Sequence, residues 1–86
     1  MTVRVEFTYE MSKKLGVRVI DVDAKTVADV VDASRQRFGD ETEAFEQLAS
    51  RAALAVNGVL VRHRKRLKTQ LDDGDRVTFV KAAAGG

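Results

Sequence analysis

The sequence predicts an α+β domain in which a mixed, four- to five-stranded sheet carries one main helix on one face. Three features indicate this fold class: a pair of β-branched runs at the start, an amphipathic helical segment in the middle, and short apolar runs separated by turn-forming residues at the end. A sheet and a helix that each have one apolar face bury those faces against each other. The 86 residues, of which 44% are hydrophobic, fit one globular domain.

The first two strands are expected at residues 3–7 and 17–22. In the first run, β-branched and aromatic residues alternate with polar ones, which is the period of a half-buried strand. In the second run, Ile20 and Val22 are expected to point inward. The polar residues between the runs, which end at Gly16, predict a turn, so the two strands should form a hairpin.

The main helix is expected over residues 27–38, after Thr26 as its N-cap. Asp29 stands three residues after Thr26, at the spacing of a capping box. Gly39 follows the last turn, where a helix end favours a left-handed residue. The residues that share one face at helical spacing are Val27, Val30, Val31, Ser34 and Phe38.

The second half of the chain predicts a short helix and a strand meander. Residues 40–50 should form the helix, with Phe45 and Leu48 inward, and residues 52–56 the next strand. Asn57-Gly58 is a strong signal for a two-residue hairpin turn with positive φ at both positions. We expect three further segments: a strand at 59–61, a turn at 72–75, and a final strand at 76–80 with Val77 and Phe79 inward.

This order of elements is that of the β-grasp, or ubiquitin-like, fold. We therefore divide the chain into a β-grasp domain at 1–80 and a flexible C-terminal tail at 81–86, which ends in Gly85-Gly86. A diglycine end has no evident use in folding, because glycine has the largest entropic cost of ordering. It does suit a tail that passes through a narrow channel and presents its carboxylate to another protein.

Composition excludes several classes of function. The chain has no cysteine, so disulfides and thiolate chemistry on its own side chains are excluded. No apolar run is long enough to span a membrane, and the first residues do not resemble a secretory signal, so we expect a cytoplasmic protein without a membrane partner. His63 is the only histidine, and no second metal-binding residue stands at ligand spacing from it, so no metal site is expected. No nucleophile–base pair or phosphate loop indicates an enzyme.

Several segments together resemble the MoaD/ThiS family of ubiquitin-like sulfur carriers, which includes the small subunits of molybdopterin synthase. The resemblance extends over nearly the whole chain, and its most specific part is the series of turns and the diglycine end. The matching segments are 3–7, 26–30, 55–58, 71–77 and Gly85-Gly86.

The resemblance implies that Gly86 is adenylated by an ATP-dependent activating enzyme and then converted to a thiocarboxylate that donates sulfur. The chain would bind no cofactor itself and would not be an enzyme. Its partners would be a ThiF/MoeB-like adenylating enzyme, a sulfur donor such as a cysteine desulfurase or rhodanese, and a sulfur-accepting synthase subunit. The residues of the tail that would enter the partner are Lys81, Ala82, Ala83, Ala84 and Gly85. Extended, the six residues 81–86 reach roughly 20 Å.

The resemblance also implies a docking patch on the outward face of the sheet. Positions that match Leu60 and Val80 belong to it, and Thr8 on the first strand is adjacent. Alternation along the last strand makes Val80 an exposed apolar residue. The alternative is that these are ordinary scattered surface residues, which need no functional explanation.

Other functions remain open at this level. A ubiquitin-like modifier joined through Gly86 to target lysines would use the same activated tail. A nucleic-acid-binding or scaffold module is a further alternative, although the basic segment has no aromatic residues to stack on bases. Residues 51–86 carry a net charge of 8 − 3 = +5. The basic segment at 62–68 is therefore expected to be a solvated loop, or a contact for an acidic partner through Arg62, Arg64, Lys65 and Arg66. The acceptor of the sulfur could be molybdopterin, thiazole, cysteine, a tRNA base or a secondary metabolite, with molybdopterin preferred.

Overall fold

A computed structural model of the chain describes residues 1–61 and 68–81. The strands and helices follow one another as β1 (Thr2–Glu6), α1 (Tyr9–Leu15), β2 (Val19–Asp23), α2 (Val27–Phe38), a short 3-10 helix (Gly39–Glu41), α3 (Thr42–Ser50), β3 (Ala52–Val56), β4 (Val59–Leu60) and β5 (Arg76–Lys81). The predictions for residues 62–67 and 82–86 lie outside the described residues.

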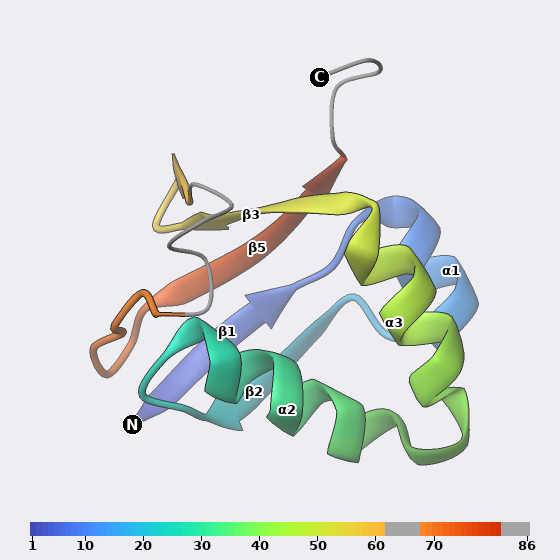
Figure 1. Ribbon diagram of the computed structural model, residues 1–86, viewed down its shortest axis with the longest axis horizontal. Coiled ribbons are helices and arrows are strands. Elements are labelled where there is room, and N and C mark those ends of the chain that lie inside the picture. Colours follow the sequence, from blue (N-terminus) through green and yellow to red (C-terminus); the bar gives the residue numbers. More distant parts are fainter. Residues whose placement is uncertain (62–67, 82–86) are drawn as a thin grey trace.

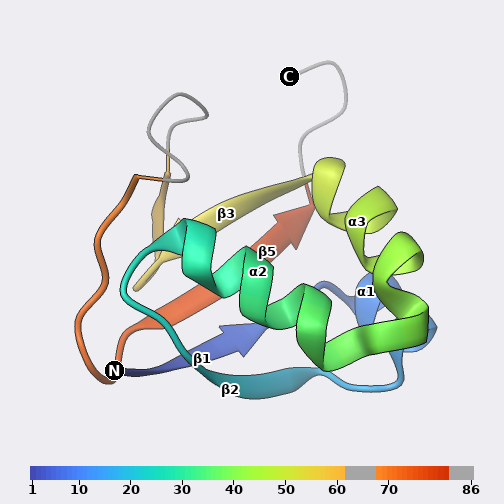
Figure 2. The ribbon, with the colours of Figure 1, turned by 60° about the horizontal axis from the view of Figure 1, so that its bottom comes forward.

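The strands form one mixed sheet in the order β2-β1-β5-β3-β4 (Figure 1). β1 runs antiparallel to β2 and parallel to β5, while β3 runs antiparallel to both β5 and β4. The helix α2 crosses one face of this sheet, and α1 and α3 lie together towards one end of it (Figure 2). The predicted β-grasp architecture, with a mixed sheet and a main helix on one face, is confirmed.

The connection between the first two strands is a helix, so the predicted turn is wrong. Thr8 caps α1, because its Oγ1 accepts a hydrogen bond from the backbone N–H of Met11 at 3.0 Å. Gly16 ends α1 with φ of 78°, in the left-handed region. Met11 is buried and fixes the helix to the core. In β2, Ile20 is buried as predicted.

The main helix has the predicted bounds and cap. The side chain of Thr26 accepts from the N–H of Asp29, and Asp29 accepts from the N–H of Thr26, both at 3.2 Å. Of the predicted inward face, Val27, Val30 and Ser34 are buried. The Ser34 hydroxyl donates to the carbonyl of Val30 at 2.8 Å, which satisfies a polar group that would otherwise be costly to bury.

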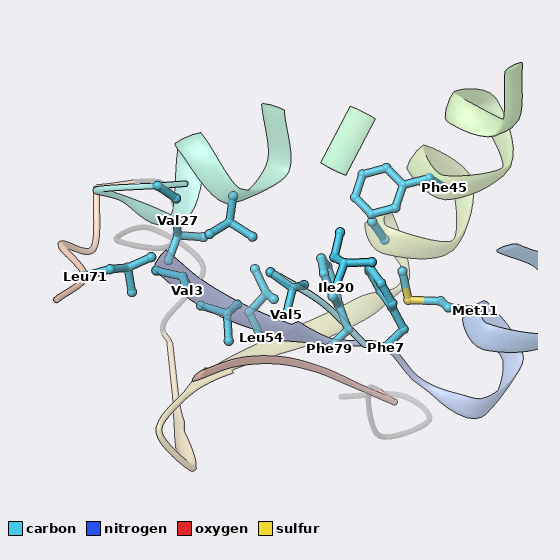
Figure 3. Packing of buried hydrophobic residues seen from close by; sticks show 14 residues of the cluster. Val3, Val5, Phe7, Met11, Ile20, Val27, Phe45, Leu54, Leu71 and Phe79 are labelled. Carbon is cyan, nitrogen blue, oxygen red and sulfur yellow. The ribbon is translucent and has the colours of Figure 1, made fainter. Parts of the chain in front are cut away.

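The core lies between the sheet and the helices and contains a group of four phenylalanines, several of which Figure 3 labels. Phe45 of α3 is fully buried, and its ring centroid lies 5.5 Å from that of Phe38 and 5.9 Å from that of Phe79. Phe7 completes the group, 5.7 Å from Phe79. These rings hold α2, α3 and the central strands together.

Candidate functional site

The predicted tail starts at the end of the sheet where the central strand β5 ends. Lys81 is the last residue of β5, is exposed, and pairs with Ala52 at the start of β3. The predicted tail residues that lie outside the described part are Ala82, Ala83, Ala84, Gly85 and Gly86. The predicted contacts for an acidic partner also lie outside it: Arg62, Arg64, Lys65 and Arg66.

The outer face of the sheet, which is the face opposite α2, carries the predicted docking residue Leu60. Paired residues share a face of the sheet, and the pairings place five residues in one row across all the strands: Val19, Glu6, Thr78, Ala55 and Leu60. Leu60 is 65% exposed at the open end of this row. Its neighbour Ala55 is buried, although it lies on the outer face. The row therefore ends in an apolar surface at β3 and β4.

The other two predicted docking residues, Val80 and Thr8, are less available to a partner than expected. Val80 points to the outer face beside its partner Ala53, but it is half-buried and not exposed. Thr8 lies beyond the end of β1, and its side chain is engaged as the N-cap of α1. The Thr8 oxygen is therefore engaged as an acceptor in this cap, while its hydroxyl hydrogen can still donate.

Charged residues occupy the part of the outer face away from Leu60. The Arg4 Nε lies 3.8 Å from a carboxylate oxygen of Asp21, and the Arg76 Nε lies 3.7 Å from one of Glu6. The two arginines are directly paired across β1 and β5 and are more than half exposed. Exposed ion pairs of this kind contribute little to stability. Their side chains can therefore exchange these partners for carboxylates of another protein.

The Asn57-Gly58 turn positions Leu60, and it has the predicted geometry. Asn57 and Gly58 have φ of 50° and 86°. The Asn57 amide donates to Asp75 at 2.9 Å, and its oxygen accepts from the N–H of Arg76 at 3.0 Å. These bonds tie the hairpin to the start of β5.

The carboxylate of Asp75 is stabilised in its charged form by this same turn. The backbone N–H of Asp72 donates to it at 2.8 Å, and the Asn57 amide donates to it as well. These two hydrogen bonds, that of Asp72 first, lower the pKa of Asp75 below its usual value.

The helix that sequence reasoning missed forms a groove with α3. One hollow of about 340 Å³ lies between the starts of α1 and β3 and is lined by Thr8, Arg51 and Lys81 among others. A second hollow of about 490 Å³ continues between α1 and α3. The two adjoin, because Tyr9, Glu10 and Leu48 line both, and we call them together the α1–α3 groove. The sequence signals for it were Thr8 as a cap and Gly16 as a C-terminal glycine.

The candidate surfaces on the described residues are the outer sheet face and the α1–α3 groove. Within 1–61 and 68–81, no group of three or more acidic or histidine side chains is arranged to hold a metal ion. No helix in this part of the chain has the length and apolarity to cross a membrane.

Comparison with protein-family models identifies the family: the model of the ThiS family matches residues 5–86. A search of curated proteins found no match.

Solved structures with the same fold include three with full or nearly full coverage. A chain in the complex of subunits 1 and 2 of molybdopterin-converting factor from Helicobacter pylori is 22% identical, with a TM-score of 0.66 and 100% of both chains covered. A chain in the BexX/CysO complex from Amycolatopsis orientalis is 25% identical, with a TM-score of 0.75 and 98% and 99% covered. The small archaeal modifier protein SAMP1 from Methanosarcina acetivorans is 20% identical, with a TM-score of 0.74 and 99% and 96% covered.

Proposed function

Because the chain belongs to the ThiS family of ubiquitin-like sulfur carriers, we propose that its C-terminal Gly86 is adenylated by a partner enzyme and then converted to a thiocarboxylate. The observation that carries this proposal is that the family match runs past the last strand and through Gly85-Gly86. The family match therefore includes the diglycine end, which supports a role for it.

The chemistry explains why such a protein needs no reactive side chain. A carboxylate is a poor electrophile, so the enzyme first joins it to the AMP portion of ATP and releases pyrophosphate. A sulfur nucleophile then attacks the carbonyl carbon, the bond to AMP breaks, and a thiocarboxylate remains. The chain contributes recognition and positioning, which give a tethered group a high effective concentration. We therefore propose a carrier or co-substrate, and not an enzyme, acting in the cytoplasm, where ATP is supplied.

The outer sheet face around Leu60 is the proposed docking surface. Leu60 is exposed next to Ala55, and Val80 adds a half-buried apolar side chain on the same face. Burial of such a patch against a partner removes apolar area from water. Two of the similar structures are complexes, one of molybdopterin-converting factor subunits and one of BexX with CysO. By analogy, we propose an adenylating enzyme of the ThiF/MoeB type, a sulfur donor and a sulfur-accepting synthase subunit as partners, and molybdopterin as the first acceptor to test.

A second candidate function is that of a protein modifier. One similar structure is a small archaeal modifier protein. An adenylated Gly86 is also open to attack by a lysine amine, which would displace AMP and form an isopeptide bond. Both functions require the same activated tail, so they differ only in the nucleophile.

Intact mass spectrometry separates these functions. The protein is incubated with ATP, a ThiF/MoeB-type enzyme from the same organism, and sulfide. A mass gain equal to one oxygen-to-sulfur exchange supports the carrier, and conjugates with other proteins in an extract support the modifier. A variant that lacks Gly86 is the control and should show neither product. An unchanged mass of the intact chain together with no conjugates in the extract, with an enzyme that is active on another carrier, would refute both functions.

A further inference from the structure

The α1–α3 groove lies at the same edge of the domain as the end of β5. Lys81 lines the groove and is the last residue before the tail. The groove continues from there between α1 and α3, which lie together at this end of the sheet (Figure 1). Because residues 82–86 directly follow Lys81, a protein that binds them comes within roughly 18 Å of the groove.

The groove combines an apolar base with a basic rim. Half-buried Leu48 contributes apolar surface, and Tyr9 is 73% exposed. The charged side chains that line the two hollows are four cations and one anion: Lys13, Lys14, Arg51, Lys81 and Glu10. Among residues 1–61 and 68–81, none of these four cations takes part in an ion pair.

Tyr9 and Lys13, which both line the groove, form a cation–π contact. The Lys13 Nζ lies 5.4 Å from the centroid of the Tyr9 ring. This contact holds a cation beside an exposed aromatic surface, so that a bound segment can bury an apolar side chain and pair a carboxylate at the same place. The excess of unpaired positive charge favours an acidic segment over a basic or neutral one.

We propose that the α1–α3 groove is a second docking surface, which receives an acidic segment bearing an apolar side chain from the adenylating enzyme that holds the tail. This proposal rests on the proposed function, because it needs an enzyme that engages Gly86. The outer sheet face and the groove then contact the enzyme on two sides of the end of β5. Contacts at two surfaces fix the direction in which the tail leaves the domain, which a single flat surface does not.

The test compares two double charge reversals with equal net charge. Lys13→Glu/Lys14→Glu changes the rim of the groove, and Lys25→Glu/Lys68→Glu changes two exposed lysines that do not line it. The assay is ATP–pyrophosphate exchange with the ThiF/MoeB-type enzyme of the same organism, and thermal unfolding verifies that each variant is folded.

The groove variant should raise KM about fivefold or more with kcat unchanged, and the difference should shrink at high salt. The control variant should stay within about twofold of the parent. Tyr9→Ala, which changes no charge, should also raise KM. In addition, a photo-crosslinking amino acid at position 9 should label an acidic segment of the enzyme.

The outcomes that overturn the proposal are distinct from failure of the proposed function. If the groove and control variants behave alike, while removal of Gly86 abolishes exchange, the groove has no docking role and the carrier function stands. If the groove variant lowers KM, or position 9 crosslinks to the chain's own tail, the tail is the occupant and the proposal is wrong. If the parent protein supports no exchange with an active enzyme, the proposed function fails and the groove assignment fails with it.

Discussion

Replacement of Asn57 tests how the late hairpin is held to the last strand. Asn57 has φ of 50°, a region that L-residues with a Cβ rarely adopt. Its side chain also makes two hydrogen bonds, one to the Asp75 carboxylate and one from the N–H of Arg76. Asn57→Gly removes the two hydrogen bonds and keeps the backbone conformation easily accessible. Asn57→Ala removes the same bonds and adds the cost of placing alanine at positive φ.

The lost hydrogen bonds and the positive φ each contribute to the expected loss of stability. Each hydrogen bond contributes roughly 0.5–1.5 kcal/mol, so the loss of two in Asn57→Gly should cost about 1–3 kcal/mol. Alanine in the left-handed region adds about 1 kcal/mol, so Asn57→Ala should cost about 2–4 kcal/mol. A loss of 1 kcal/mol lowers Tm by roughly 4–8 °C in a domain of this size. The alanine variant should therefore unfold about 4–8 °C below the glycine variant.

Urea and thermal unfolding of the parent and both variants measure these differences. If Asn57→Gly is as destabilising as Asn57→Ala or more so, the backbone argument is wrong. If neither variant differs from the parent, the two hydrogen bonds make no net contribution. The Leu60 surface should move with the hairpin, so weaker binding of the adenylating enzyme by the alanine variant is a second readout.

Three further predictions concern the core, the docking surface and acid. Phe45→Ala should lower the free energy of unfolding in urea by about 3–5 kcal/mol, because a fully buried ring is lost from the phenylalanine group; a loss below about 1 kcal/mol would contradict this packing. Leu60→Asp should leave Tm within a few degrees, because the side chain is 65% exposed, but should raise KM in pyrophosphate exchange; an unchanged KM would remove Leu60 from the docking surface. The lowered pKa of Asp75 means that the unfolded chain binds more protons near pH 4, so this group's contribution to stability is present above about pH 4 and is lost as pH falls through the lower, folded-state pKa. Asp75→Asn should therefore lose less stability than the parent between about pH 5 and pH 3 in urea titrations, and equal losses would refute the assignment.

The sequence contained enough information for the strands, the main helix and the Asn57-Gly58 turn, because each depends on local chemistry. The Thr26–Asp29 capping box and the positive φ of Asn57 and Gly58 follow from preferences of those residue types at those positions. The inward positions of Val77 and Phe79 follow from strand alternation and are also observed.

The sequence did not predict helix α1, because its polar residues are typical of a turn and its helical signals are limited to the caps Thr8 and Gly16. Only Met11 in this helix is buried, so the apolar period over seven residues is too short to indicate a helix. The half-buried state of Val80 depends on neighbours brought together by the fold, such as Ala53, and alternation along one strand could not show it. The same is true of the α1–α3 groove, which exists only because two segments distant in sequence pack side by side.

The parallel pairing of β1 with β5 explains why the groove and the tail share one edge. Since the two strands run in the same direction, the segment that follows β1 and the segment that follows β5 leave the sheet at the same end. Thr8 and α1 follow β1, and Lys81 is the last residue of β5. Weakening of the α1 cap by Thr8→Ala should therefore disturb the groove but leave the outer face near Leu60 intact. If the free-energy changes calculated from the rises in KM for Thr8→Ala and Leu60→Asp add in the double variant, the enzyme contacts the two surfaces independently.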